Sequence, residues 1–224
     1  MKITERRSVR LSVDGKPLEG RLTLPERPLG VALFVTGTAG ARHVSFAESL
    51  AERMHDFQFA TYVMDLISPV ESDDRSIRVD VEQLCKRLDI QCDWLRTQDA
   101  VSDVPIVLCG LDTGAAVAAE YVPRAQCEPA GLAFLNGRLD LAEGNLSGLN
   151  LPLLFFVDRA HRYLLEVNRS AYEHAPVGQQ QKSLLHDVDS DAVSLVTHWA
   201  RSQVTDTETR LTDEERTDSR HGAF

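Results

Sequence analysis

The chain has 224 residues, of which 43% are hydrophobic and 26% are charged, and its formal net charge is −10. This length and composition are typical of one globular domain with a sizeable core. The acidic balance opposes contact with nucleic acid or with an anionic membrane surface, so we expect neither as a partner.

The N-terminal part of the sequence predicts a β-hairpin. Ser8–Val13 and Leu18–Leu24 alternate between apolar and polar residues, and the segment between them, Asp14-Gly15-Lys16-Pro17, has turn-forming composition. Alternation is typical of a strand with one solvated face, so we expect the hairpin at the edge of a sheet.

After the hairpin, continuous apolar runs typical of strands buried on both faces alternate with segments of helical periodicity. The expected strands are residues 31–36, 59–66, 105–110, 130–135, 153–157 and 181–186. The expected helices are residues 44–54, 77–96, 113–121, 164–172 and 192–201. Regular alternation of this kind predicts a mostly parallel sheet with helices on both faces.

We expect one domain over residues 1–203 and a disordered tail over residues 204–224. The part after Val204 contains five threonines, six acidic residues, three basic residues and almost no apolar ones. Such a segment buries too little apolar surface to offset the entropy that it would lose on ordering.

The turn between the expected strand 105–110 and the expected helix 113–121 reads Gly110-Leu111-Asp112-Thr113-Gly114. It matches the G-x-S-x-G nucleophile elbow, except that aspartate stands where the serine belongs. The further motifs that accompany it are Leu33–Gly40, Arg42-His43 and Leu164–Arg169. Together these segments resemble the dienelactone-hydrolase-like branch of the α/β-hydrolase superfamily.

The resemblance implies a single-domain α/β-hydrolase fold, with a mostly parallel central sheet flanked by helices. It also implies a nucleophile, an acid and a histidine in that order along the chain. Asn136–Pro152, where a cap domain would be inserted, is too short to hold one, so we expect no large cap domain.

The resemblance also assigns candidate site residues. The nucleophile position falls on Asp112, the acid on Asp158 and the base on His186, whereas an alignment on Leu164–Arg169 puts His161 at the acid's place. The oxyanion hole would combine the backbone N–H of Thr113 with an N–H of the first glycine-containing turn. The remaining implied residues are Thr38 or Ala39 in that turn, and Arg42, His43 and His161 as pocket candidates.

Two interpretations of Asp112 stay open. In the first, the site is degenerate and binds a small ligand or a partner, and Asp112 stabilises the elbow as a helix N-cap. In the second, the chain is an active cytoplasmic hydrolase in which Asp112 attacks saturated carbon, as in haloalkane dehalogenases and epoxide hydrolases, with a downstream acid and histidine. A homodimer is compatible with both interpretations.

We expect no cofactor and no metal. The turn after the expected strand 31–36 lacks the G-x-x-x-x-G-K-[ST] and G-x-G-x-x-G patterns of phosphate and dinucleotide sites. Asp187, Asp189 and Asp191 alternate, but the glycine and the distal glutamate of an EF-hand are missing. Asp191 is instead expected to cap the last helix.

The four cysteines are Cys85, Cys92, Cys109 and Cys127, and none forms a C-x-x-C pair. We expect them to be small buried residues in a reducing cytoplasm. The charged start of the chain has no apolar segment after it, and no apolar run approaches about 18 residues. We therefore expect neither a signal peptide nor a transmembrane helix.

Overall fold

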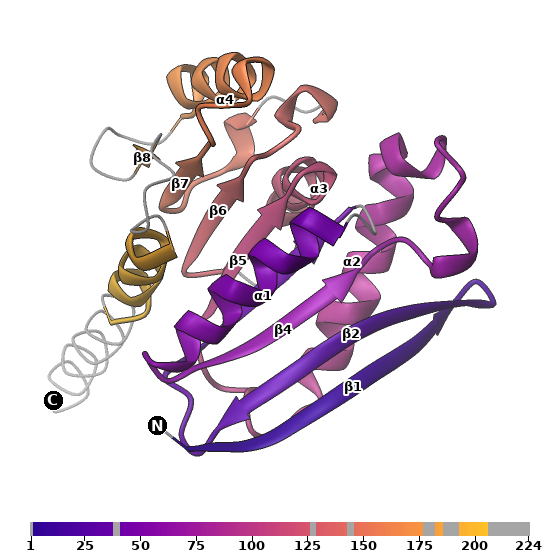
Figure 1. Ribbon diagram of the computed structural model, residues 1–224, viewed down its shortest axis with the longest axis vertical. Coiled ribbons are helices and arrows are strands. Elements are labelled where there is room, and N and C mark those ends of the chain that lie inside the picture. Colours follow the sequence, from indigo (N-terminus) through magenta and orange to yellow (C-terminus); the bar gives the residue numbers. More distant parts are fainter. Residues whose placement is uncertain are drawn as a thin grey trace, which may run out of the picture.

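A computed structural model describes residues 2–37, 41–125, 129–142, 146–176, 182–185 and 193–205, with side chains outside 41–44 and 182–185. Its centre is an eight-stranded sheet in the order β1-β2-β4-β3-β5-β6-β7-β8. Figure 1 shows the strands side by side, with α1 crossing one face of the sheet.

The predicted edge hairpin is confirmed. The strands β1 (Ile3–Val13) and β2 (Lys16–Pro25) pair antiparallel, and β1 lies at the end of the sheet. The loop residues Asp14 and Gly15 have positive φ angles of 52° and 73°. Two such residues form the tight turn whose twist matches the strands that it joins.

Six further strands run parallel to one another, as the apolar runs predict. They are β3 (Gly30–Thr36), β4 (Phe59–Asp65), β5 (Ile106–Leu111), β6 (Gly131–Leu135), β7 (Leu153–Phe156) and β8 (Lys182–Leu185). Every residue of β3, β6 and β7 is buried, because helices cover both faces of the sheet. The carboxyl ends of these strands therefore meet at one edge (Figure 1).

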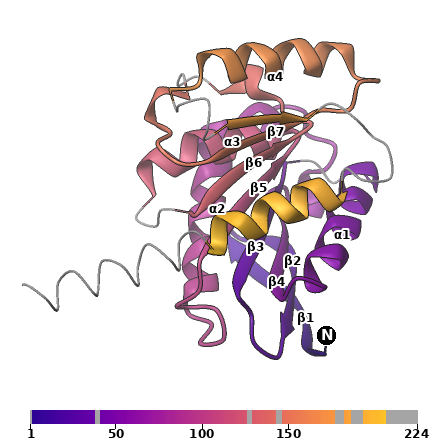
Figure 2. The same ribbon diagram turned by 90° about the vertical axis from the view of Figure 1, so that its left-hand side faces the viewer.

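The helices form two layers. The four bounded helices are α1 (Ala41–His55), α2 (Val81–Arg96), α3 (Thr113–Tyr121) and α4 (Arg162–His174), and residues 193–205 are also helical. Side chains of α2, α3 and α4 pack in one apolar core, and those of α1 and residues 193–205 pack in a second core. Figure 2 shows α1 and the 193–205 helix together on one side of the sheet.

Short 3-10 helices occupy the connections, and they are η1 (Pro69–Glu71), η2 (Ile77–Val79), η3 (Val122–Arg124), η4 (Leu139–Leu141) and η5 (Leu146–Gly148). One of them corrects an expectation: the helix predicted from residue 77 begins only at Val81. The Asp80 carboxylate accepts a hydrogen bond from the backbone N–H of Gln83, so it caps α2 and ends η2 before it.

The C-terminal helix extends further than the sequence pattern indicates. Residues 193–205 are helical, and Val204 is buried with its side chain beside Gly30. Residue 204 therefore belongs to the domain. Residues 206–224, which are the rest of the expected tail, and Asp191, the expected cap, lie outside the described residues.

A buried ion pair joins α2 to the loop after β4. The Arg87 guanidinium donates to both carboxylate oxygens of Glu71, over 2.7 and 2.9 Å. The side chains are 1% and 8% exposed. Lys16 of the hairpin also donates to Glu71. These contacts hold the pKa of Glu71 down at about 2, chiefly through the hydrogen bonds from Arg87.

Burial matches the expectation for three cysteines, since Cys85, Cys92 and Cys109 are buried free thiols. Desolvation raises the pKa of Cys85 to about 11 and that of Cys109 to about 12. Cys127 lies outside the described residues. Within the described part of the chain, every helix is too short or too polar to cross a membrane.

Candidate functional site

The predicted elbow is present at the carboxyl edge of the sheet. Asp112 directly follows the central strand β5 and directly precedes α3, and its φ and ψ angles are 50° and −123°. A non-glycine residue in this region carries strain of order 1–3 kcal/mol. Such strain is typical of a turn that holds one side chain out at the end of a strand.

Three glycines allow the elbow to form. A Cβ on Gly114 would lie 2.1 Å from the carbonyl oxygen of Val35 in β3. A Cβ on Gly110 would lie 2.6 Å from Cα of Ala115, and one on Gly37 would lie 2.6 Å from Cβ of Thr113. The frame of the motif is therefore a steric requirement, because β3, β5 and α3 approach one another too closely for any side chain.

The expectation that Asp112 caps α3 is wrong. The Asp112 side chain makes no capping hydrogen bond to α3, whereas its backbone carbonyl accepts the N–H of Ala115 at 3.1 Å. A capping side chain needs its residue in the extended region of φ and ψ. The positive φ of Asp112 directs the carboxylate elsewhere, so capping does not explain why aspartate stands in the elbow.

Asp158 occupies the place expected for the acid. It follows β7 by two residues, and its N–H donates to the side-chain oxygen of Asn136 at 2.8 Å. Its own carboxylate accepts the N–H of Ala160 at 2.8 Å. The carboxylate thus stabilises the turn that leads into α4, and its role as a catalytic acid stays a prediction.

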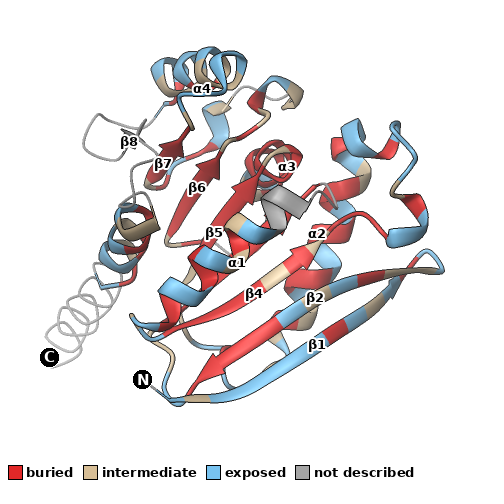
Figure 3. Ribbon diagram, viewed as in Figure 1, coloured by how far each residue is buried: buried red, intermediate tan, exposed pale blue. Residues whose placement is uncertain are grey.

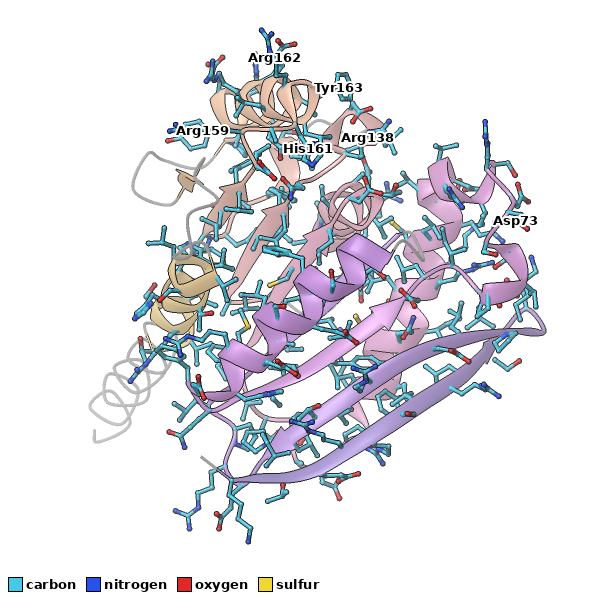
Figure 4. All side chains as sticks on the ribbon, in the orientation of Figure 1. Asp73, Arg138, Arg159, His161, Arg162 and Tyr163 are labelled. Atoms are coloured by element: carbon cyan, nitrogen blue, oxygen red, sulfur yellow. The ribbon has the colours of Figure 1, made fainter. Side chains whose placement is uncertain are left out.

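His161 lies on the same turn. It is exposed, it precedes α4, and its N–H donates to the carbonyl of Asp158 at 3.0 Å. Figure 4 shows His161 beneath α4, whereas Arg162 points away from the sheet. The structure therefore places both candidates for the acid position, Asp158 and His161, next to each other at the carboxyl edge.

Several predicted site residues are not described in full. Thr38, Ala39 and His186 lie outside the described residues, and for Arg42 and His43 only the backbone, in the first turn of α1, is described. Thr113 is the first residue of α3 and is 3% exposed. Its N–H belongs to the first turn, where backbone donors have no partner within the helix.

The carboxyl edge also holds an arginine that sequence reasoning missed. Arg138 lies after β6, and its guanidinium donates to both carboxylate oxygens of Asp140, from Nε and Nη2 at 2.8 Å each. The Tyr163 hydroxyl donates to the same carboxylate at 2.9 Å, and the guanidinium lies 5.9 Å from the centre of the Tyr163 ring. Figure 4 shows Arg138 and Tyr163 beside each other at the start of α4.

Electrostatic interaction links the cluster of Arg138, Asp140 and Tyr163 to the elbow. Hydrogen bonds from Arg138, and then from Tyr163, lower the pKa of Asp140. The pKa of Arg138 is raised, first by Asp140 and to a smaller extent by the charge of Asp112. The signal that could have located Arg138 is its position three residues after an apolar strand, since ligands of parallel sheets bind at the carboxyl ends.

A second missed group lies on the other side of the elbow. Asp65 ends β4, and the Thr36 hydroxyl of neighbouring β3 lies within hydrogen-bond distance of its carboxyl group. Burial raises the pKa of Asp65, and this effect exceeds the lowering by Thr36. Thr36 belongs to the Leu33–Gly40 segment, but Asp65 belongs to no motif, and the parallel pairing of β3 and β4 brings the two residues together.

The overall structure is similar to solved hydrolases. Dienelactone hydrolase from Anabaena variabilis superposes with a TM-score of 0.76 at 22% identity, over 90% of this chain and 97% of that chain. Est1E from Butyrivibrio proteoclasticus gives 0.65 at 13% identity over 90% and 99%, and the esterase domain of a Rhodothermus marinus protein gives 0.65 at 18% over 89% and 100%. These likenesses show the α/β-hydrolase fold.

Sequence comparison finds a relative whose name is not that of a hydrolase. No family model matches the chain. A protein of Mycobacterium tuberculosis named "Putative phosphoribosyl transferase", found in two strains, is 32% identical over 160 residues. The match covers 71% of this chain but 36% of that protein, so this chain corresponds to about a third of its length.

Proposed function

We propose that this α/β-hydrolase-fold chain is a non-catalytic protein that binds a small ligand at the carboxyl edge of its sheet. In this proposal the Asp112 carboxylate is a binding group rather than a nucleophile. One observation carries the proposal: the strained elbow is intact around an aspartate whose side chain does not cap α3. The strain of the turn is therefore kept without the stabilisation that a cap would give.

Ester hydrolysis is disfavoured by the chemistry of the replaced group. A serine hydroxyl attacks a carbonyl after a histidine removes its proton, and the acyl-enzyme that forms is then hydrolysed. Attack by a carboxylate on the same carbonyl would form a mixed anhydride, which is more reactive than the ester itself. The elbow therefore keeps the strand–turn–helix backbone of the motif without its serine.

The ligand is inferred from what a carboxylate recognises. An ionised carboxylate only accepts hydrogen bonds, so the group that reaches Asp112 has to be a donor, such as a hydroxyl or an ammonium group. The backbone N–H of Arg138 donates to the carbonyl of Asp112, and the Arg138 guanidinium, which is paired with Asp140, suits an anionic group that would take the place of that carboxylate. A phosphorylated sugar has both, and the name of the mycobacterial relative includes a phosphoribosyl group.

A second candidate is a hydrolase that uses Asp112 as its nucleophile. It is favoured by the position of Asp112 between β5 and α3, which is the position of the nucleophile in the elbow motif. Asp112 would displace a leaving group from saturated carbon, and water activated by a histidine would hydrolyse the resulting ester. Asp158 and His186 would be its acid and base.

Ligand binding tests the first proposal. Thermal unfolding of the wild-type chain is measured with ribose 5-phosphate, ribose and inorganic phosphate, and then repeated for Asp112→Asn and Asp99→Asn. Asp99 is an exposed carboxylate before β5, at the opposite end of the strand. We expect ribose 5-phosphate to raise the melting temperature of the wild type and of Asp99→Asn, but not that of Asp112→Asn. A stabilisation that survives Asp112→Asn contradicts the proposed role of this carboxylate.

Restoring the serine tests the loss of catalysis. Wild type and Asp112→Ser are assayed with activated short-chain esters. We expect negligible turnover by both, because serine also needs a correctly placed base. Strong serine-dependent turnover would show that the remaining catalytic groups are in position, and that only the nucleophile was lost.

A further inference from the structure

Asn168 is a buried polar residue in the middle of α4. It is 0% exposed, and its amide nitrogen donates to the carbonyl of Leu164 at 2.8 Å and to that of Gly137 at 2.7 Å. Its side-chain oxygen has no hydrogen-bond partner among the described residues. Asparagine is a poor helix former, and a buried acceptor without a partner costs about 1–3 kcal/mol. The residue is therefore unfavourable for the helix that contains it.

Gly137 belongs to the turn Asn136–Gly137–Arg138 after β6, and this turn contacts both sides of the candidate site. The N–H of Arg138 donates to the carbonyl of Asp112 at 3.0 Å. The side-chain oxygen of Asn136, whose φ is 49°, accepts the N–H of Asp158 at 2.8 Å. The turn thus connects the elbow to the position expected for the acid.

The turn also presses directly on the elbow helix. A Cβ on Gly137 would lie 2.7 Å from the Cβ of Ala115, in the first turn of α3. The turn therefore packs against the first turn of α3 with no room for a side chain at position 137. The carbonyl of Gly137 accepts a hydrogen bond from the Asn168 amide, and this bond attaches α4 to the turn.

We propose that Asn168 is a positioning residue that fixes the turn 136–138, and through it the Asp112 backbone and the Arg138 side chain. It touches no ligand in this account. One amide hydrogen is donated to the carbonyl of Gly137 and the other to that of Leu164 in α4. The turn is thus held against α4, and the N–H of Arg138 stays in place to donate to the carbonyl of Asp112. The consequence for binding rests on the proposed function, whereas the positioning itself does not.

Hydrogen exchange of the full chain tests the positioning without any ligand. Exchange protection is measured by NMR for the amides of Arg138 and Asp158 and for those of β5. The variant Asn168→Leu keeps the volume and removes both donors. The matched control is Thr197→Val. Thr197 is also 0% exposed and donates to a helix carbonyl, that of Val193 at 2.7 Å, but its helix packs in the core on the opposite face of the sheet.

We expect Asn168→Leu to lower the protection of the Arg138 and Asp158 amides by at least about tenfold relative to the β5 amides. In Thr197→Val any loss should be uniform across these amides. Wild-type protection at Arg138 and Asp158 in Asn168→Leu would overturn the proposal. A uniform loss like that of the control would overturn it too, since Asn168 would then act only on global stability.

The isosteric variant Asn168→Asp adds a test that packing alone does not satisfy. Its carboxylate would face two carbonyl oxygens and repel them, whereas the protonated acid donates one hydrogen bond. Burial raises a carboxyl pKa, so protonation is expected at mildly acidic pH. We expect the protection at Arg138 and Asp158 to be lost at pH about 8 and partly regained at pH about 5. Protection that does not depend on pH contradicts the donor role.

The same variants separate this inference from the proposed function. If Asn168→Leu loses local protection and also the thermal shift with ribose 5-phosphate, both stand. If local protection falls and the wild type shows no shift with any ligand tested, the positioning role stands and the proposed function fails. If protection is unchanged and ligand binding is intact, the proposed function stands and the positioning role fails.

Discussion

Two arginine–carboxylate pairs in this chain are both bidentate but lie in different surroundings. The Arg87 and Glu71 side chains are 1% and 8% exposed, whereas those of Arg138 and Asp140 are 34% and 22% exposed. The first pair ties α2 to the loop after β4 and to the hairpin. The second lies at the carboxyl edge beside the elbow. The difference indicates that the buried pair stabilises the fold, whereas the partly exposed pair at the candidate site can exchange its partner for a ligand.

Breaking the buried pair should have the largest effect. In Glu71→Ala the guanidinium of Arg87 stays buried without its carboxylate, and we expect a loss of about 3–5 kcal/mol in the free energy of unfolding. Urea denaturation measures it. Replacing both residues by methionine is the control and should recover most of the loss. A loss below about 1 kcal/mol in Glu71→Ala would show that burial does not distinguish the two pairs.

The second largest effect is expected from acid, which protonates Glu71 and so breaks the buried pair. The pKa of Glu71 is about 2 in the folded chain against an ordinary 4.5, so its contribution is fully present above pH 4.5 and is lost as the pH falls toward 2. We expect the free energy of unfolding to drop by about 2–3 kcal/mol over this interval from this residue. The double methionine variant should show a shallower dependence. Equal slopes for the two proteins would contradict the assignment.

A third experiment tests whether the backbone at the carboxyl edge is tightly packed, although the ion pair there is partly exposed. We expect Gly114→Ala to cost about 1–3 kcal/mol or more, because its Cβ would lie 2.1 Å from the carbonyl oxygen of Val35. Gly15→Ala is the control, since nothing lies within 4 Å of its Cβ and only its φ of 73° opposes the change. Equal losses in denaturation would show that the elbow has more room than the structure gives it.

The smallest effect is expected at the exposed pair. Asp140→Asn should change the free energy of unfolding by less than about 1 kcal/mol, because solvent screens a partly exposed ion pair. It should nevertheless alter the thermal shift with ribose 5-phosphate, since it releases the Arg138 guanidinium. A stability loss as large as that of Glu71→Ala would remove the contrast between the pairs.

Much of the fold could be predicted from the sequence, because strand burial and helix periodicity are local patterns. The edge hairpin, the six parallel strands and the bounds of α3 at Thr113 and Tyr121 are examples. The predicted start of α2 at residue 77 is wrong, because the Asp80 cap begins the helix about one turn later, at Val81. Figure 3 shows the resulting pattern, with buried central strands and an exposed β1.

For the candidate site, the sequence predicts the backbone turn but not the side chains that surround it. The elbow motif fixed the place of Asp112, since the glycines and the strand–turn–helix order are sequential features. Arg138, Tyr163 and Asn168 could not be assigned, because their roles depend on the directions of side chains from β6 and α4 that meet only in the fold. The capping role given to Asp112 failed for the same reason, as the positive φ that prevents it is not visible in the sequence.

The central claim is that Asp112 does not act as a nucleophile. It is tested most directly by incubating the wild-type chain with a panel of haloalkanes and epoxides and measuring its intact mass, with Asp112→Asn as the control. We expect that neither protein gains mass. A covalent alkyl adduct on wild-type Asp112, absent from Asp112→Asn, would contradict it and establish the aspartate-nucleophile hydrolase instead.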